Sequence, residues 1–243
     1  PALEAGKTYY VMVDTGATTA TLQSSQRRRA LPITLEPCAD GALFCDIPTG
    51  FWAQREAEAW YTAGITSGCR SETQPYRDLP FCPQQMLSVD TAAIFLLRHL
   101  IDPAFRPTQP YRGLYADVPE SHRRSLWIEA LHDEIGFVAR SNCPQVEGEQ
   151  RFCPQAPLLR EDLLRILVAA LELAPGAETA LHYVDLADAP ALSALATVAW
   201  ESGILPDADP ACPDLGMGPR FCPQEPARRI DGAVWMVRAF SQA

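Results

Sequence analysis

Cysteine is the residue type with the clearest chemistry in this sequence. The chain has eight: Cys38, Cys45, Cys69, Cys82, Cys143, Cys153, Cys212 and Cys222. Three of them stand in an identical stretch, Phe-Cys-Pro-Gln, and each of these follows another cysteine by 13, 10 or 10 residues. These separations predict the local disulfides Cys69–Cys82, Cys143–Cys153 and Cys212–Cys222, with Cys38–Cys45 as the remaining pair. Disulfides persist in oxidising compartments, so the pattern favours an extracellular protein.

Zinc binding is the alternative use of these cysteines. Structural zinc sites usually combine Cys-x-x-Cys pairs with nearby histidines. The sequence has no Cys-x-x-Cys, and its four histidines are scattered: His99, His122, His132 and His182. We therefore favour disulfides over a metal site, and we expect the histidines to lie on the surface or to have structural hydrogen bonds.

Carboxylates gather in one loop near the end of the chain, where Asp207, Asp209 and Asp214 stand close to Gly216 and Gly218. Calcium takes several oxygen ligands and is one interpretation of this loop, but we favour a solvated acidic loop. The sequence contains no Gly-x-Ser-x-Gly, no phosphate-binding loop and no Cys-x-x-Cys-His. The lack of these motifs predicts a protein that is not an enzyme and uses no cofactor.

The composition excludes several classes of partner. Of 243 residues, 47% are hydrophobic, which is enough for a packed core. The formal net charge of −10 argues against binding to nucleic acid and against electrostatic docking on anionic lipid. No apolar run approaches the ~20 residues that span a bilayer, so we expect no membrane insertion.

The elements that carry the cysteines occur in three copies. The Phe-Cys-Pro-Gln stretches are 71 and 69 residues apart, which predicts one supersecondary unit repeated three times. The copies span residues 44–101, 114–173 and 182–243. Each opens on an aromatic residue followed by Asp46, Asp117 or Asp185, which we expect to act as a helix N-cap or in an Asx-turn.

Two helices are predicted in each copy, so the fold class is mainly α. The first helices are expected at residues 51–63, 121–134 and 190–202, each ending at a glycine: Gly64, Gly136 and Gly203. The residues that follow these glycines, Ile65, Phe137 and Ile204, are expected to enter the core. The second helices follow Phe-Cys-Pro-Gln and place apolar residues on one face, as at Leu159, Leu163, Ile166 and Leu167.

The first 43 residues differ from the rest. Residues 1–29 predict a β-hairpin with strands at 7–14 and 18–24, and residues 30–43 predict a connector containing Pro32 and Pro37. The stretch from Leu3 to Val11 resembles the closing strands of extracellular β-sandwich domains of the pre-peptidase type. Because an isolated hairpin is marginally stable in water, we expect this one to pack on another part of the protein or on another molecule.

The order of residues in copy one is similar to that of a known repeat. Phe44-x-Asp46 is followed by Trp52-Ala53 and then by Gly64-Ile65-Thr66-Ser67-Gly68. This order resembles the S-layer homology (SLH) repeat, and three tandem copies are that family's usual arrangement. The resemblance covers about residues 44–240. It implies a pseudo-threefold helical bundle at the cell surface that binds an acidic, often pyruvylated, cell-wall polysaccharide.

The resemblance also implies the residues that contact the sugar. The second helix of the SLH repeat carries Thr-Arg-Ala-Glu, whose arginine meets the acidic sugar, and the matching residues here are Arg160 with Asp162 and Arg229 with Asp231. Copy one has Val89 and Thr91 at these positions. The aromatic ring of Trp52 and the loop amides at Gly64 and Gly68 complete the expected glycan-binding set.

Two functions follow as hypotheses. The first is a non-enzymatic extracellular module that anchors a surface protein to the cell envelope by binding its polysaccharide. The alternative is a structural subunit that self-associates into a filament or surface layer, in which the N-terminal strand pairs with a neighbouring molecule.

Overall fold

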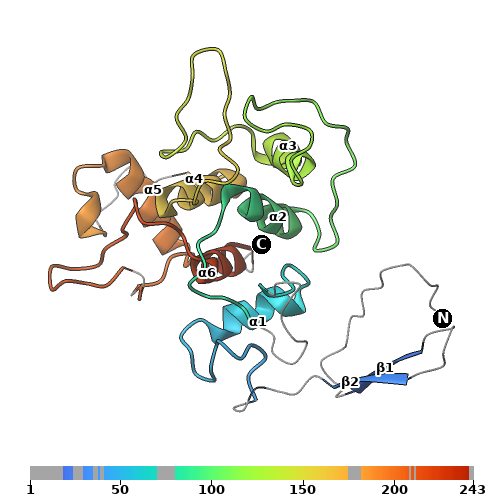
Figure 1. The fold of residues 1–243 in the computed structure, drawn as a ribbon. Coiled ribbons are helices and arrows are strands. Elements are labelled where there is room, and N and C mark those ends of the chain that lie inside the picture. The colour runs from blue at the N-terminus through green and yellow to red at the C-terminus, as the bar shows by residue number, and fades with distance from the viewer. Residues whose placement is uncertain are drawn as a thin grey trace. The chain divides into compact units, whose positions relative to one another are not determined.

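The computed structural model describes residues 19–23, 30–34, 38, 41–69, 80–174, 182–207, 209–210 and 212–240. Its described part is mainly helical, with two short strands (Figure 1). The elements are β1 (Thr19–Gln23), β2 (Ala30–Thr34), α1 (Gln54–Thr62), α2 (Val89–Leu100), α3 (Ser125–Ile135), α4 (Arg160–Ala170), η1 (Val184–Leu186), α5 (Pro190–Glu201) and α6 (Arg229–Phe240). The chain divides into unit one, Pro1–Phe51 with Gly68–Phe81, and unit two, Trp52–Ser67 with Cys82–Ala243.

β1 lies within the strand expected at residues 18–24, but its partner β2 lies in the expected connector. β1 pairs antiparallel with β2, with Leu22 opposite Leu31, so the first five residues of the expected connector form a strand. The expected strand at residues 7–14 lies outside the described residues. Leu31 and Ile33 alternate with Pro32 and Thr34, which is the two-residue period of a strand. We had treated Pro32 as evidence for a connector, but proline is tolerated in a strand that has a free edge.

Unit two contains all the helices of the described residues. Helices from different copies pack against one another. The first helix of copy two, α3, contacts α2 of copy one, and α5 of copy three contacts α4 of copy two. α1 of copy one contacts α6 of copy three, and α6 also contacts α2 and α4. Each first helix is therefore buried against the second helix of another copy, so the copies depend on one another for their core.

A ring of three backbone hydrogen bonds joins the segments that precede the second helices. The amide of Leu87 donates to the carbonyl of Ala227 (2.9 Å), Ala227 to Leu158 (2.7 Å), and Leu158 to Leu87 (2.8 Å). One residue from each copy takes part, and each donates once and accepts once. The three segments thus close on one another within a single chain.

The loop of another copy also satisfies the first free amides of each second helix. Arg160 and Glu161 at the start of α4 donate to the carbonyls of Glu225 and Pro223 at 3.0 and 3.1 Å. The starts of α2 and α6 make the same two bonds to the loops of copies two and one. Helix N-termini leave such amides without an intrahelical partner, so these bonds remove a cost that burial would impose.

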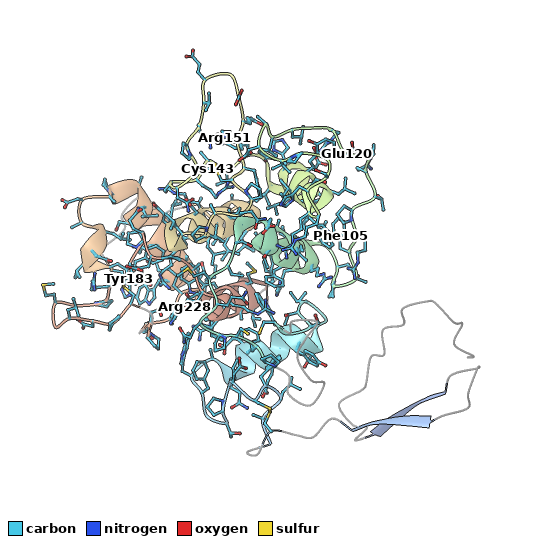
Figure 2. All side chains as sticks on the ribbon, viewed as in Figure 1. Phe105, Glu120, Cys143, Arg151, Tyr183 and Arg228 are labelled. Carbon is cyan, nitrogen blue, oxygen red and sulfur yellow. A yellow bond between two sulfur atoms is a disulfide. The ribbon has the colours of Figure 1, made fainter. Side chains whose placement is uncertain are left out.

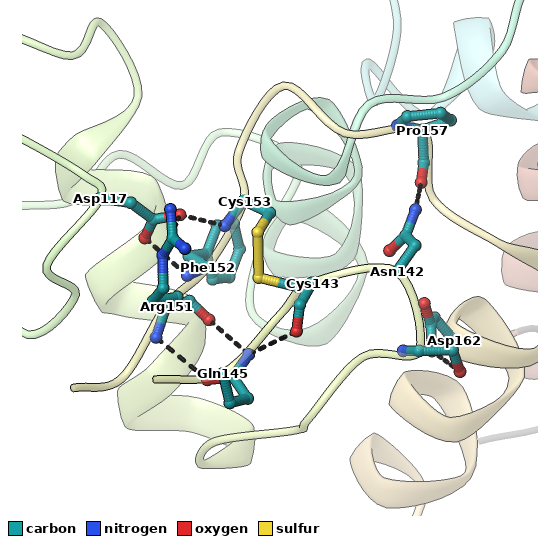
Figure 3. The surroundings of a disulfide bond; sticks show 10 residues. Asp117, Asn142, Cys143, Gln145, Arg151, Phe152, Cys153, Pro157 and Asp162 are labelled. Atoms are coloured by element: carbon teal, nitrogen blue, oxygen red, sulfur yellow. Dashed lines mark hydrogen bonds and ion pairs between the residues drawn. A yellow bond between two sulfur atoms is a disulfide. The ribbon is translucent and has the colours of Figure 1, made fainter. Parts of the chain in front are cut away.

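The aspartate near the start of each copy has a role that we did not expect. In copy two the Asp117 carboxylate accepts the amides of Phe152 and Cys153, both at 2.7 Å (Figure 3). Asp185 accepts the amides of Phe221 and Cys222 in the same way, and in unit one Asp46 accepts the amide of Phe81. The N-cap prediction was wrong because these carboxylates bind a loop about 35 residues later rather than a neighbouring helix.

Each residue of Phe-Cys-Pro-Gln has a separate structural task. The phenylalanines are buried, and the prolines supply carbonyls to a second helix. Cys82, Cys153 and Cys222 have φ between 49° and 58°, a left-handed conformation that is uncommon outside glycine. The glutamines of copies two and three donate to Asp90 and Glu161, which stand in the second helices of copies one and two.

The disulfide prediction is confirmed. Cys38–Cys45, Cys143–Cys153 and Cys212–Cys222 are bonded as expected, and Cys69 and Cys82 are disulfide-bonded as well. Gly64, Gly136 and Gly203 have positive φ at helix ends, as predicted. Ile65 and Ile204 enter the core, but Phe137 remains partly exposed.

We expect Asp117→Ala to lower the free energy of unfolding by about 2 kcal/mol, because two backbone amides lose their acceptor. Urea denaturation with the disulfides intact measures this change. Asp188→Ala is the matched control, since Asp188 is exposed, and its effect should stay below about 0.5 kcal/mol. Equal effects of the two substitutions would contradict the assigned role of Asp117.

Candidate functional site

The arginine expected to grip a sugar in copy two is buried. Arg160 is 2% exposed, and its Nε donates to the carbonyl of Phe221 at 2.9 Å. Its Nη2 lies 2.5 Å from Oδ2 of Asp209, and its Nη1 lies 3.6 Å from Oδ2 of Asp231. The guanidinium also stands 4.8 Å from the ring centroid of Trp235. These contacts come from copy three, so Arg160 holds two copies together.

The arginine of copy three is also directed inward. Arg229 is 6% exposed, donates to the hydroxyl of Thr66 and stands 5.1 Å from the ring centroid of Phe95 in α2. Asp231 binds Arg228 at 2.8 Å and faces Arg160, so it too is used within the protein. The structure thus brings Arg160 and Asp231 together, but as a buried ion pair and not as a ligand-binding pair.

Internal repetition explains why these arginines are buried. Arg160 and Trp235 of α6 form one cation–aromatic pair, and Arg229 and Phe95 of α2 form the corresponding pair, each aromatic being the seventh residue of its helix. Copy one has Val89 in place of the arginine, and the corresponding residue of α4 is Ile166. Both of these aliphatic residues are buried. The first residue of a second helix is thus arginine where the seventh residue of the helix it faces is aromatic, and it is aliphatic where that seventh residue is aliphatic. This correlation indicates that the arginines are used for packing between copies.

Asp162 is fully buried, and a single one of its oxygens is hydrogen-bonded among the described residues. Oδ1 accepts from the amide and the hydroxyl of Ser141 at 3.0 and 3.2 Å, whereas Oδ2 has no hydrogen-bond partner. Burial raises the pKa of Asp162, and the bonds from Ser141 oppose this shift only in part. The carboxyl group is therefore a structural group that is costly to ionise.

The remaining predicted residues keep their places in loops and at helix starts. Trp52 is 37% exposed and stands just before α1, so its ring is accessible. Gly64 and Gly68 both have positive φ, at 74° and 85°, which fits their expected use in the loop after α1. Of the predicted glycan-binding set, Arg160, Asp162, Arg229 and Asp231 are buried.

A different group of basic and aromatic side chains lies on the surface of unit two. Trp127 of α3 has the guanidinium carbons of Arg98 and Arg106 at 5.6 and 5.9 Å from its ring centroid. The ring of Phe105, which is labelled in Figure 2, meets that of Trp127 edge-on at 5.9 Å. Arg106 is exposed and the other three residues are partly exposed. We call these four residues the arginine–tryptophan surface.

The fold places these residues with short hydrogen bonds. Arg98, near the end of α2, donates to the carbonyl of Ile65 at 2.7 Å. The turn after α2 is held by Asp102, whose carboxylate accepts the amide of Ala104 and whose carbonyl accepts that of Phe105. This turn brings residues 105–106 against α3.

The electrostatics of this surface favour an anion. Burial, and in second place the charge of Arg106, lowers the pKa of Arg98. Among the described residues, Nε of Arg98 is a buried donor without a hydrogen-bond partner. Two guanidinium groups beside one ring can bind a carboxylate, and the ring offers an apolar face to a sugar.

Sequence reasoning missed the arginine–tryptophan surface because its residues come from three places in the chain. Phe105 and Arg106 stand among prolines in the linker between the predicted copies one and two, and Trp127 does not occupy the position of Trp52. The one available signal was an aromatic–arginine pair in that linker. Such a pair predicts no partner by itself.

The metal interpretations find little support in the described residues. Asp117 lies with Cys143 and Cys153, and Asp185 with Cys212 and Cys222, but these sulfurs are bonded to each other and three ligand atoms are fewer than zinc takes. The three aspartates of the acidic loop bind separate partners. Asp207 accepts from Trp200, Asp209 pairs with Arg160, and Asp214 accepts three loop amides.

Comparison with known proteins gives no family for this chain: no family model matches it, and no curated protein is significantly similar to it. Within the described part of the chain, no helix has the length and apolar character needed to cross a bilayer.

We expect Arg160→Ala to lower the free energy of unfolding by about 3–5 kcal/mol, because the buried side chain of Asp209 would lose this cation and Asp231 would keep only Arg228 among the described residues. Arg165→Ala, one turn later on α4 and partly exposed, should cost less than about 1 kcal/mol. Chemical denaturation compares the two variants. An Arg160→Ala protein as stable as wild type would show that the buried cluster does not hold the copies together.

Asp162 should also make stability depend on pH. Its pKa is raised in the folded state, so the folded protein holds this proton more tightly than the unfolded chain does. The free energy of unfolding should therefore fall as pH rises from about 4, the ordinary pKa, through the higher folded pKa. Asp162→Asn should remove this component of a denaturation series measured against pH, whereas Asp188→Asn should leave it in place. An unchanged pH dependence in Asp162→Asn would contradict the assignment.

Proposed function

We propose that this protein is an extracellular, non-enzymatic module of three SLH-type repeats that attaches a surface protein to the cell envelope by binding an acidic polysaccharide. The fold part of the proposal rests on the ring of hydrogen bonds between residues 87, 158 and 227 and on the equivalent helix starts. These contacts between corresponding segments support a pseudo-threefold arrangement of the three repeats. The disulfides are compatible with an extracellular location.

The observation that carries the binding function is the arginine–tryptophan surface. Acidic sugars present a carboxylate beside the apolar face of a ring. The exposed guanidinium of Arg106, together with the partly exposed Arg98 and Trp127, offers matching groups. This surface replaces Arg160 and Arg229 as the proposed anionic-sugar contact, since both of those arginines are buried. Trp52 is the second aromatic contact of this proposal, because it is 37% exposed.

A structural subunit that self-associates is the second candidate function. The observation that favours it is that both motif arginines, Arg160 and Arg229, have internal partners from other copies. In this protein the arginines of the expected sugar-binding motif hold the repeats together. Such a chain can keep the fold of a wall-binding module without binding the polysaccharide.

The arginine–tryptophan surface is tested by binding to isolated envelope polysaccharide, before and after removal of its acidic substituents. We expect Arg106→Ala to weaken binding about tenfold, the effect of losing one charge-assisted hydrogen bond, and Trp127→Leu to weaken it at least as much. Arg106 is exposed, and its side chain donates hydrogen bonds to the neighbouring carbonyls of Ala104 and Phe105, so its loss should leave stability unchanged.

Arg123→Ala is the matched control, because Arg123 is an exposed arginine just before α3. It should retain wild-type affinity. Failure of the wild-type protein to bind the polysaccharide, or equal weakening by Arg123→Ala, would count against this function.

A further inference from the structure

An open groove of about 600 Å³ lies in unit two between the segment after α3, helix α4 and helix α5. It is lined by Phe137, Val138 and Ala139 after α3, by Val168 and Ala169 of α4, and by Leu195 of α5. Phe137 was expected to enter the core, and it lines this groove instead. The groove falls within the size range of ligand pockets and is mainly apolar.

A loop elsewhere in unit two carries exposed apolar side chains that could occupy such a groove. The docking loop, residues 213–218, lies inside the ring closed by the disulfide between Cys212 and Cys222. At its tip Leu215 and Met217 are 64% and 71% exposed, the highest values of any large hydrophobic side chain in the described residues. A soluble domain seldom exposes two such side chains together without a partner.

The docking loop is also held in one conformation. The Asp214 carboxylate accepts the amides of Gly216, Met217 and Gly218 at 2.7, 3.1 and 3.0 Å. These same bonds lower the pKa of Asp214, so the carboxylate stays ionised. A loop that is ordered before it binds loses less conformational entropy on binding.

The charges at the two surfaces correspond. Two charged residues line the groove: Arg165 of α4, which also lies 3.6 Å from Glu161, and Glu172, which stands two residues after the end of α4. The docking loop carries the Asp214 carboxylate before its apolar tip and Arg220 after it. A loop seated in the groove can therefore place Asp214 beside Arg165 and Arg220 beside Glu172.

We propose that the docking loop of one molecule inserts Leu215 and Met217 into the groove between α4 and α5 of a second copy of this chain. The two surfaces differ, so the contact is head-to-tail, and repetition of it gives a filament or a layer unless the molecules close into a ring. This inference rests on the second candidate function, self-association, and it names the two surfaces that would make the contact. It does not depend on polysaccharide binding.

The expected affinity is low. A contact made by one loop buries less surface than a stable complex does, so a Kd on the order of 0.1 mM is expected. Molecules held side by side on an envelope would associate at that affinity, since tethering gives effective concentrations of about 1 mM.

Sedimentation velocity of the full chain, from about 1 µM to about 1 mM, tests the proposal. Wild type should show mass that increases with concentration. The loop variant, Leu215→Asp with Met217→Asp, and the groove variant, Ala169→Arg, should each remain monomeric over this range. All four disulfides and the helical circular dichroism spectrum should be retained, because residues 169, 215 and 217 are exposed. Val146→Asp is the matched control, an exposed apolar residue in the corresponding loop of copy two, and it should associate as wild type does.

Mixing the two variants gives the sharpest result. The groove variant still has a docking loop and the loop variant still has a groove, so an equimolar mixture should form one-to-one dimers and nothing larger. Monomeric wild type at every concentration, variants that associate like wild type, or a mixture that stays monomeric would each overturn the proposal. Arg106→Ala should associate normally, so a failure here is separate from a failure of polysaccharide binding.

Discussion

The ring of three backbone hydrogen bonds between Leu87, Leu158 and Ala227 is the constraint on which unit two depends. Each bond joins the segment before one second helix to the corresponding segment of another copy. The same segments place the loop carbonyls that accept the first amides of these helices, and every first helix packs on a second helix from another copy. A single copy would leave helix amides and an apolar face exposed, so the three copies must fold together.

Sequence periodicity predicted the parts of this fold that depend on local separations. The helices, their terminal glycines and the local disulfides follow from patterns within about 15 residues, and the structure agrees with them. The partner of each helix and the loop bound by Asp117 and Asp185 could not be predicted, because these contacts join separate elements of the chain. The aspartates, for example, bind amides 35 to 37 positions away. Phe-Cys-Pro-Gln recurs without change because each of its residues has a specific contact or backbone conformation to maintain.

The candidate site was harder to predict than the fold for a physical reason. A motif can identify an arginine, but the direction of its side chain depends on the groups that compete for the guanidinium. Asp209, the Phe221 carbonyl and the Trp235 ring surround Arg160, and none of them belongs to the motif. The arginine–tryptophan surface shows the converse, because its residues belong to no motif and are brought together only when the turn after α2 meets α3.

The contact between copies one and two shows that the copies can pack without a buried arginine. Val89 and Ile166 stand here in place of the arginine and the aromatic residue that pair at the other two contacts between copies. Two buried aliphatic side chains can therefore take the place of a guanidinium and an aromatic ring. In copy two Arg140, from the loop after α3, nevertheless lies 4.5 Å from the ring centroid of Phe152. Burial lowers the pKa of Arg140, yet the cation is retained against an aromatic face. The buried guanidinium groups of Arg140, Arg160 and Arg229 are therefore packing elements, and a function that needs an accessible cation must use an exposed arginine such as Arg106.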